Sequence, residues 1–80
     1  MDPKACIEAW LTCSDLSEQI DLSEGYQHWL MRGGFKGRVK LGGGICGTVE
    51  DMRTGYLMVK LDNTSIDPVR FFRDELTAVL

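Results

Sequence analysis

The sequence has one histidine, three cysteines and no long apolar run among its 80 residues. A membrane-spanning helix needs about 20 consecutive apolar residues, so this absence predicts a soluble protein. The first ten residues lack an extended apolar core, and they do not have the pattern of a secretory signal. With 44% hydrophobic and 26% charged residues, the composition is that of a single globular domain spanning residues 1–80.

The three cysteines, Cys6, Cys13 and Cys46, are an odd number and match no disulfide framework. Unpaired thiols are typical of reducing compartments, which predicts a cytoplasmic location. Structural zinc sites use paired ligands two to four residues apart, and neither the cysteines nor His28 form such a pair. We therefore expect structural thiols, with no metal and no other cofactor.

The formal net charge is −3, and the acidic excess lies in the first half of the chain. Residues 1–34 carry two basic and six acidic side chains, whereas residues 35–80 carry seven basic and six acidic ones. An acidic chain is electrostatically unfavourable for binding nucleic acid. A local basic strip in the second half remains compatible with this distribution.

The first helix is expected to start at Asp2 and Pro3, because an aspartate can cap a helix and proline suits its first turn. Apolar residues then follow at steps of three and four, which is the period of a helix with one buried side. This buried side consists of Cys6, Ile7, Trp10, Leu11 and Cys13.

A second helix is expected to run from Leu16 to Arg32. Ser14 or Asp15 can cap it, and Glu18 completes a capping-box arrangement with Asp15. Gly33 and Gly34 can adopt the left-handed conformation that ends a helix, and Phe35 is expected to dock where the chain reverses. The predicted buried side consists of Leu16, Ile20, Tyr26, Trp29 and Leu30, with Ser23 completing the period.

After Gly37 the hydrophobic period changes to two, which predicts β-strands. The pattern gives five short strands, at 37–41, 45–50, 56–61, 69–72 and 77–80, with a 3₁₀ turn before the last. Inward-facing positions are Val39, Leu41, Ile45, Val49, Leu57, Val59 and Leu61.

Five glycines lie between Leu41 and Asp62. A phosphate-binding loop places its glycines directly before a helix, whereas these precede strands. Gly55 stands where a hairpin requires a positive φ, and Gly47 stands where a neighbouring strand can approach closely. We interpret the glycines as the corners of a small, sharply bent sheet.

Residues 37–80 resemble the SH3-like small-barrel class, in which a 3₁₀ turn precedes the last strand. The spacing of Gly44, Gly47 and Val49 is similar to that of KOW-type modules. The resemblance, together with the helical pattern of residues 1–34, implies an α+β fold: an N-terminal helical hairpin packed on a five-stranded SH3-like barrel formed by residues 35–80. The class includes protein-binding and nucleic-acid-associated modules, so the resemblance assigns no functional residue here.

The outward faces of the strands carry more apolar and aromatic side chains than solvent normally meets. The protein's own helices can cover them, another protein or a second copy can, and both arrangements can hold at once. We favour a non-catalytic protein-interaction module that self-associates or serves as an accessory subunit of a larger assembly. Its expected binding residues are Met52, Arg53, Tyr56, Met58, Arg70, Phe72 and Arg73.

The alternative function is a nucleic-acid-binding module that uses a basic face of the barrel. Arg38, Lys40 and Lys60 share the non-core side of their strands and would contact phosphates. No catalytic set is expected: Cys46 and His28 lie in different halves of the chain, and the adjacent acids Asp74 and Glu75 diverge on a turn.

Overall fold

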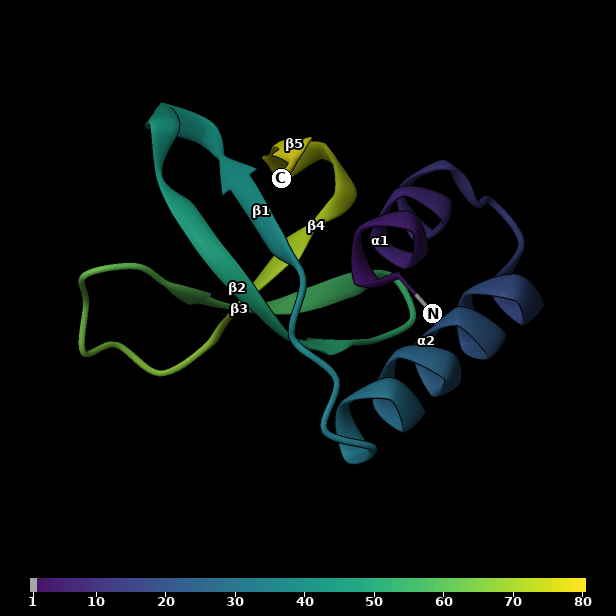
Figure 1. The fold of residues 1–80 in the computed structure, drawn as a ribbon. Helices are drawn as coiled ribbons and strands as arrows, with labels where there is room; N and C mark the ends of the chain where they lie inside the picture. The colour runs from purple at the N-terminus through teal and green to yellow at the C-terminus, as the bar shows by residue number, and fades with distance from the viewer. Residues whose placement is uncertain (1) are drawn as a thin grey trace.

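The computed structural model describes residues 2–80 as two helices followed by a five-stranded antiparallel sheet. The elements are α1 (Pro3–Thr12), α2 (Leu16–Met31), β1 (Arg38–Leu41), η1 (Gly42–Gly44), β2 (Cys46–Met52), β3 (Tyr56–Leu61), β4 (Val69–Phe72), η2 (Arg73–Glu75) and β5 (Leu76–Val79). The sheet has the order β4-β3-β2-β1-β5 and curls strongly into a half-barrel (Figure 1). The predicted fold class is confirmed, including the 3₁₀ turn η2 before the last strand.

Both helices begin where the sequence predicts. The carboxylate of Asp2 accepts a hydrogen bond from the Lys4 N–H at 3.0 Å, and that of Asp15 accepts one from the Ser17 N–H at 2.9 Å. At the end of α2, Gly33 has a φ of 85°, and the next residue returns its N–H to the Trp29 carbonyl at 2.9 Å. This arrangement satisfies the last helical carbonyls and directs the chain toward the sheet.

The helix α1 packs on the inner face of the sheet. Cys6, Ile7 and Trp10 are buried there in one cluster with the inward residues of β1, β2 and β3. The Trp10 indole N–H also donates to the Arg53 carbonyl at 2.8 Å, in the turn between β2 and β3. The indole thus fills the core and satisfies its polar atom at the same time.

The helix α2 packs with only part of the predicted side. Tyr26 is buried and Ser23 faces the sheet as expected, but Leu16 and Ile20, also expected in the core, are 64% and 46% exposed. Gln19, which was not predicted to face inward, joins Ser23 and Tyr26, and each of the three forms a hydrogen bond with the backbone of β2 or of the turn that follows it. These polar contacts orient α2 and turn the apolar residues at its start toward solvent.

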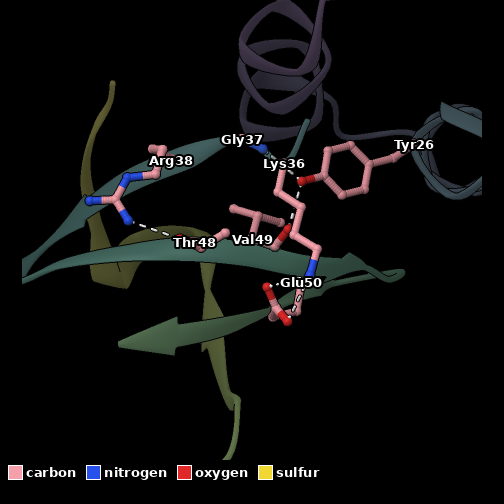
Figure 2. Close-up of polar contacts among 7 residues, drawn as sticks. All are labelled: Tyr26, Lys36, Gly37, Arg38, Thr48, Val49 and Glu50. Carbon is pink, nitrogen blue, oxygen red and sulfur yellow. Dashed lines mark hydrogen bonds and ion pairs between the residues drawn. The ribbon is translucent and has the colours of Figure 1, made fainter. Parts of the chain in front are cut away.

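Tyr26 makes the most deeply buried of these contacts (Figure 2). Its hydroxyl donates to the Val49 carbonyl at 2.6 Å and accepts from the Gly37 N–H at 2.9 Å. One side chain of α2 therefore fixes both β2 and the segment that enters β1.

Alternation along the strands is confirmed for most inward positions, including Val39, Leu41, Val49, Leu57 and Val59. Ile45 was also expected inside, but it is 49% exposed because β2 begins one residue later, at Cys46. Gly55, at the turn between β2 and β3, has the predicted positive φ of 90°.

A β-bulge in β2 overturns the prediction for Met52. The register with β3 shifts between Val49 and Asp51, so Glu50 is an extra residue and the alternation changes phase. Met52 consequently points inward and is only 1% exposed. It belongs to the core and offers no side chain to a partner.

The two helices lie together on one side of the sheet, and the loop of residues 62–68 projects from the other side (Figure 1). Lys60 holds this loop by donating from its ammonium group to the carbonyls of Thr64 and Ile66. Within residues 2–80, neither helix is long and apolar enough to cross a bilayer.

Candidate functional site

Four of the predicted binding residues form one cluster on the outer face of β3 and β4. Tyr56 and Phe72 are directly opposite each other in the register, as are Met58 and Arg70. The Tyr56 and Phe72 rings meet edge to face with centroids 6.3 Å apart, and the Arg70 guanidinium lies 5.6 Å from the Tyr56 centroid. We call these four residues the aromatic patch.

The alternation of the strands keeps the aromatic patch out of the core. Leu57 and Val59 of β3 point inward, so the residues that alternate with them, Tyr56 and Met58, point outward. Phe72 is 50% exposed, and Tyr56 and Met58 are half-buried. The helices pack among the inward residues, so they do not cover this face, contrary to one of the two expected arrangements.

The remaining residues of the predicted set, Met52, Arg53 and Arg73, make contacts within the chain. Met52 is in the core, as described above. Arg53 donates from Nε to the Asp51 carboxylate at 2.7 Å, which supports the strand after the bulge. Arg73 donates to the Cys13 carbonyl in the connection between the helices. Both arginines are exposed, but their guanidinium groups are already engaged within the chain.

Two of the three side chains of the predicted basic strip are bonded within the chain, and one of these two, Arg38, is paired with an acidic group. Arg38 donates to both carboxylate oxygens of Asp62, at 2.7 and 2.6 Å. It also donates to the Thr48 hydroxyl at 2.8 Å, as Figure 2 shows. The ammonium group of Lys60 is held by the loop carbonyls. Of the three strip residues, Lys40 alone has no side-chain partner within residues 2–80. This arrangement weakens the positive potential that phosphate binding requires.

The Arg38–Asp62 pair gives a prediction for acid stability. The Arg38 guanidinium holds the pKa of Asp62 below its ordinary value. The folded protein therefore gains stability from this pair above the carboxyl's unfolded pKa, and loses it as the pH falls through the lower folded pKa. We expect Asp62→Asn to be less stable than the wild type at about pH 7, with the difference shrinking toward about pH 2.

Urea unfolding followed by circular dichroism across this pH range measures the difference. Asp67→Asn, in the same loop, is the matched control, because the Asp67 carboxylate has no side-chain partner within residues 2–80. An Asp62→Asn difference that stays constant with pH would contradict the role of the ion pair.

Two hollows open on the surface, and neither was predicted. The larger, of about 620 Å³, lies between the end of α2 and the following chain; its lining includes His28, Trp29, Arg32 and Phe35. Phe35 was expected to dock where the chain reverses; its ring meets that of Trp29 edge to face at a centroid distance of 5.6 Å, and the residue is 70% exposed. The smaller hollow, of about 400 Å³, lies at the open end of the half-barrel, beside η2.

The three cysteines and His28 lie on different elements of the described chain or at their ends. Burial raises the pKa of the Cys6 and Cys13 thiols, which keeps them protonated and unreactive. His28 lines the larger hollow, whereas Cys46 pairs with β1 in the sheet. Within this range no three His, Cys, Asp or Glu side chains are grouped as a metal site would require.

No family model, curated protein or solved structure matches the chain. These comparisons assign no function to the aromatic patch.

Proposed function

We propose that the chain is a small, non-catalytic protein-interaction module that binds through the aromatic patch. The observation that carries this proposal is that Tyr56 contacts both Phe72 and Arg70 on a sheet face outside the cluster in which the helices pack. Aromatic residues, methionine and arginine are the types enriched at protein interfaces. In particular, tyrosine and arginine contribute disproportionately to binding energy.

The shape of the patch supports this reading. Tyr56 and Phe72 hold each other edge to face, and both belong to paired strands, so little side-chain entropy remains to be lost on binding. Arg70 has no carboxylate partner within residues 2–80. Its charge is therefore available to an acidic group of the partner at the edge of an apolar contact.

The charges of the described chain disfavour nucleic acid as the partner. Of the three cations of the basic strip, Arg38 is paired and Lys60 is bonded within the chain, which leaves Lys40 alone without a partner in residues 2–80, and the net charge is negative. A protein surface with apolar and acidic groups complements the aromatic patch better than a phosphate backbone does. The three cysteines, free in the described chain, agree with a reducing compartment such as the cytoplasm.

Site-specific photo-crosslinking tests the proposal. A benzoylphenylalanine placed at position 72 in the producing cells is expected to form adducts with protein, including other copies of the chain. The matched control carries the same group at Glu8, an exposed position on α1. Equal adducts from both positions, or none from position 72, would overturn the proposal. A salt-sensitive gel shift of single-stranded RNA that Lys40→Glu abolishes would support the nucleic-acid function instead.

A further inference from the structure

The outer face of α2 is a second surface without a partner. Leu16, Ile20 and Glu24 follow one another at steps of four along the helix, with Asp21 beside them, so they share one exposed side. We call these four residues the acidic helix face. Within residues 2–80, neither Asp21 nor Glu24 forms an ion pair. The surface therefore combines exposed aliphatic side chains with unpaired negative charge.

The acidic helix face and the aromatic patch are not paired with each other within residues 2–80, where Arg70 forms no ion pair with Asp21 or Glu24. The neighbouring side of α2, with Gln19, Ser23 and Tyr26, contacts the sheet and the turn after β2. The acidic helix face is left exposed beside that contact, and the aromatic patch lies on the outer face of the sheet, whereas the helices pack among the inward residues. We therefore look for a contact between the two surfaces that joins two molecules.

Charge decides how two copies can pair. A twofold contact between two acidic helix faces would bring four carboxylates together, and one between two aromatic patches would bring two Arg70 side chains together. Like charges in apposition are unfavourable at an interface. Pairing one surface with the other instead sets Arg70 against Asp21 or Glu24, and the aliphatic residues Leu16 and Ile20 against the aromatic patch.

We infer that the aromatic patch of one copy binds the acidic helix face of a second copy. This inference rests on the proposed function and names the partner. Because the two surfaces differ, the contact is head-to-tail, and a bound pair still presents one free surface of each kind. Association therefore continues beyond a dimer with rising concentration, unless the rotation between copies closes a ring.

Charge reversal on each surface tests the inference. By analytical ultracentrifugation, the wild-type mass is expected to rise above 9.0 kDa with concentration. Arg70→Glu and the double variant Asp21→Lys/Glu24→Lys are each expected to weaken association by about tenfold or more, because like charges then face each other. Glu8→Lys on α1 is the control and is expected to keep the wild-type behaviour. Circular dichroism verifies that each variant is folded.

Recombining the two charge-reversed surfaces is the decisive measurement. Each variant fails to associate with itself, but the mixture is expected to recover association, since every contact again joins opposite charges. A chain carrying all three substitutions is expected to self-associate again for the same reason. A twofold contact between like surfaces also lets the mixture associate, but it predicts no recovery in the chain with all three substitutions, because its like surfaces still carry like charges.

The outcomes separate this inference from the proposed function. If the wild type stays at 9.0 kDa at every concentration, the inference that the partner is a second copy is wrong. It is also wrong if the mixture, or the chain with all three substitutions, fails to recover association. If position 72 nevertheless crosslinks to a different protein, the proposed function stands and an acidic partner other than this chain occupies the patch. If neither association nor crosslinking occurs, both are wrong.

Discussion

Replacing Tyr26 with phenylalanine is expected to lower the free energy of unfolding by about 2 to 4 kcal/mol, although only one oxygen atom is removed. That oxygen satisfies the Val49 carbonyl and the Gly37 N–H, and the tyrosine has no exposed surface. Each buried backbone group left without a partner costs about 1 to 3 kcal/mol. Urea unfolding at neutral pH measures the loss. The control is Tyr56→Phe on the outer face, which is expected to change stability by less than about 0.5 kcal/mol.

The same substitution is expected to change the stability at alkaline pH. Burial, the largest cause, raises the pKa of Tyr26 to about 12. The folded state thus keeps a proton that the unfolded state loses above about pH 10, and stability falls as the pH rises from there toward 12. The wild type should lose about 2 to 3 kcal/mol from this group over that interval, whereas Tyr26→Phe has no such loss. A variant with wild-type stability and the same alkaline profile would show that the hydroxyl does not join α2 to the sheet.

Tyr26 also shows why the packing of α2 was harder to predict than its boundaries. Helix ends depend on local residues, and Asp15 and Gly33 fixed them correctly. The buried side was predicted from apolar residues, and this placed Leu16 and Ile20 wrongly in the core. The side that packs is chosen by hydrogen bonds to backbone groups far along the chain, such as that from the Gly55 N–H to the Gln19 side chain at 3.0 Å. Hydrophobic periodicity carries no information about such partners.

The sequence held part of the information about which residues of β2 face inward. Strict alternation from Val49 would point Asp51 inward, and burying an unpaired carboxylate is costly. The consecutive acids Glu50 and Asp51 before an apolar residue were therefore a signal of the bulge that turns Met52 into the core. In β1 and β3 the alternation predicted the buried positions Val39, Leu41, Leu57 and Val59 correctly.

The candidate site shows the same division between local and long-range information. Alternation alone placed Tyr56 and Met58 outward, and β4 brought Phe72 and Arg70 beside them. For the cations outside the aromatic patch, such as Arg38, the bonding partner depended on which strands became neighbours in the sheet. Arg38 is neutralised by Asp62, 24 positions away, across β2, and no sequence pattern identified that pairing.

Replacing Gly47 with alanine is expected to destabilise the sheet by about 3 kcal/mol. A Cβ atom at this position would lie well inside 3.0 Å of Val59 Cγ1 and 3.0 Å from the Lys60 carbonyl oxygen. Neither neighbour yields easily, because a valine in a strand has little χ1 freedom and the carbonyl belongs to the backbone of β3. Thermal and urea unfolding measure the loss. Gly42→Ala is the matched control, since a Cβ there has no neighbour within 4 Å, and its stability should stay within about 0.5 kcal/mol of the wild type.

A double-mutant cycle identifies the cause of the Gly47→Ala effect. Val59→Ala removes the closest atom, so Gly47→Ala should cost at least about 1 kcal/mol less in that background than in the wild type. The residual cost then reports the approach to the Lys60 carbonyl, which no side-chain change on β3 relieves. Additive effects, or a Gly47→Ala protein as stable as the wild type, would mean that β2 and β3 do not cross this closely. In that case the sharp curl that separates the aromatic patch from the helices would need another cause.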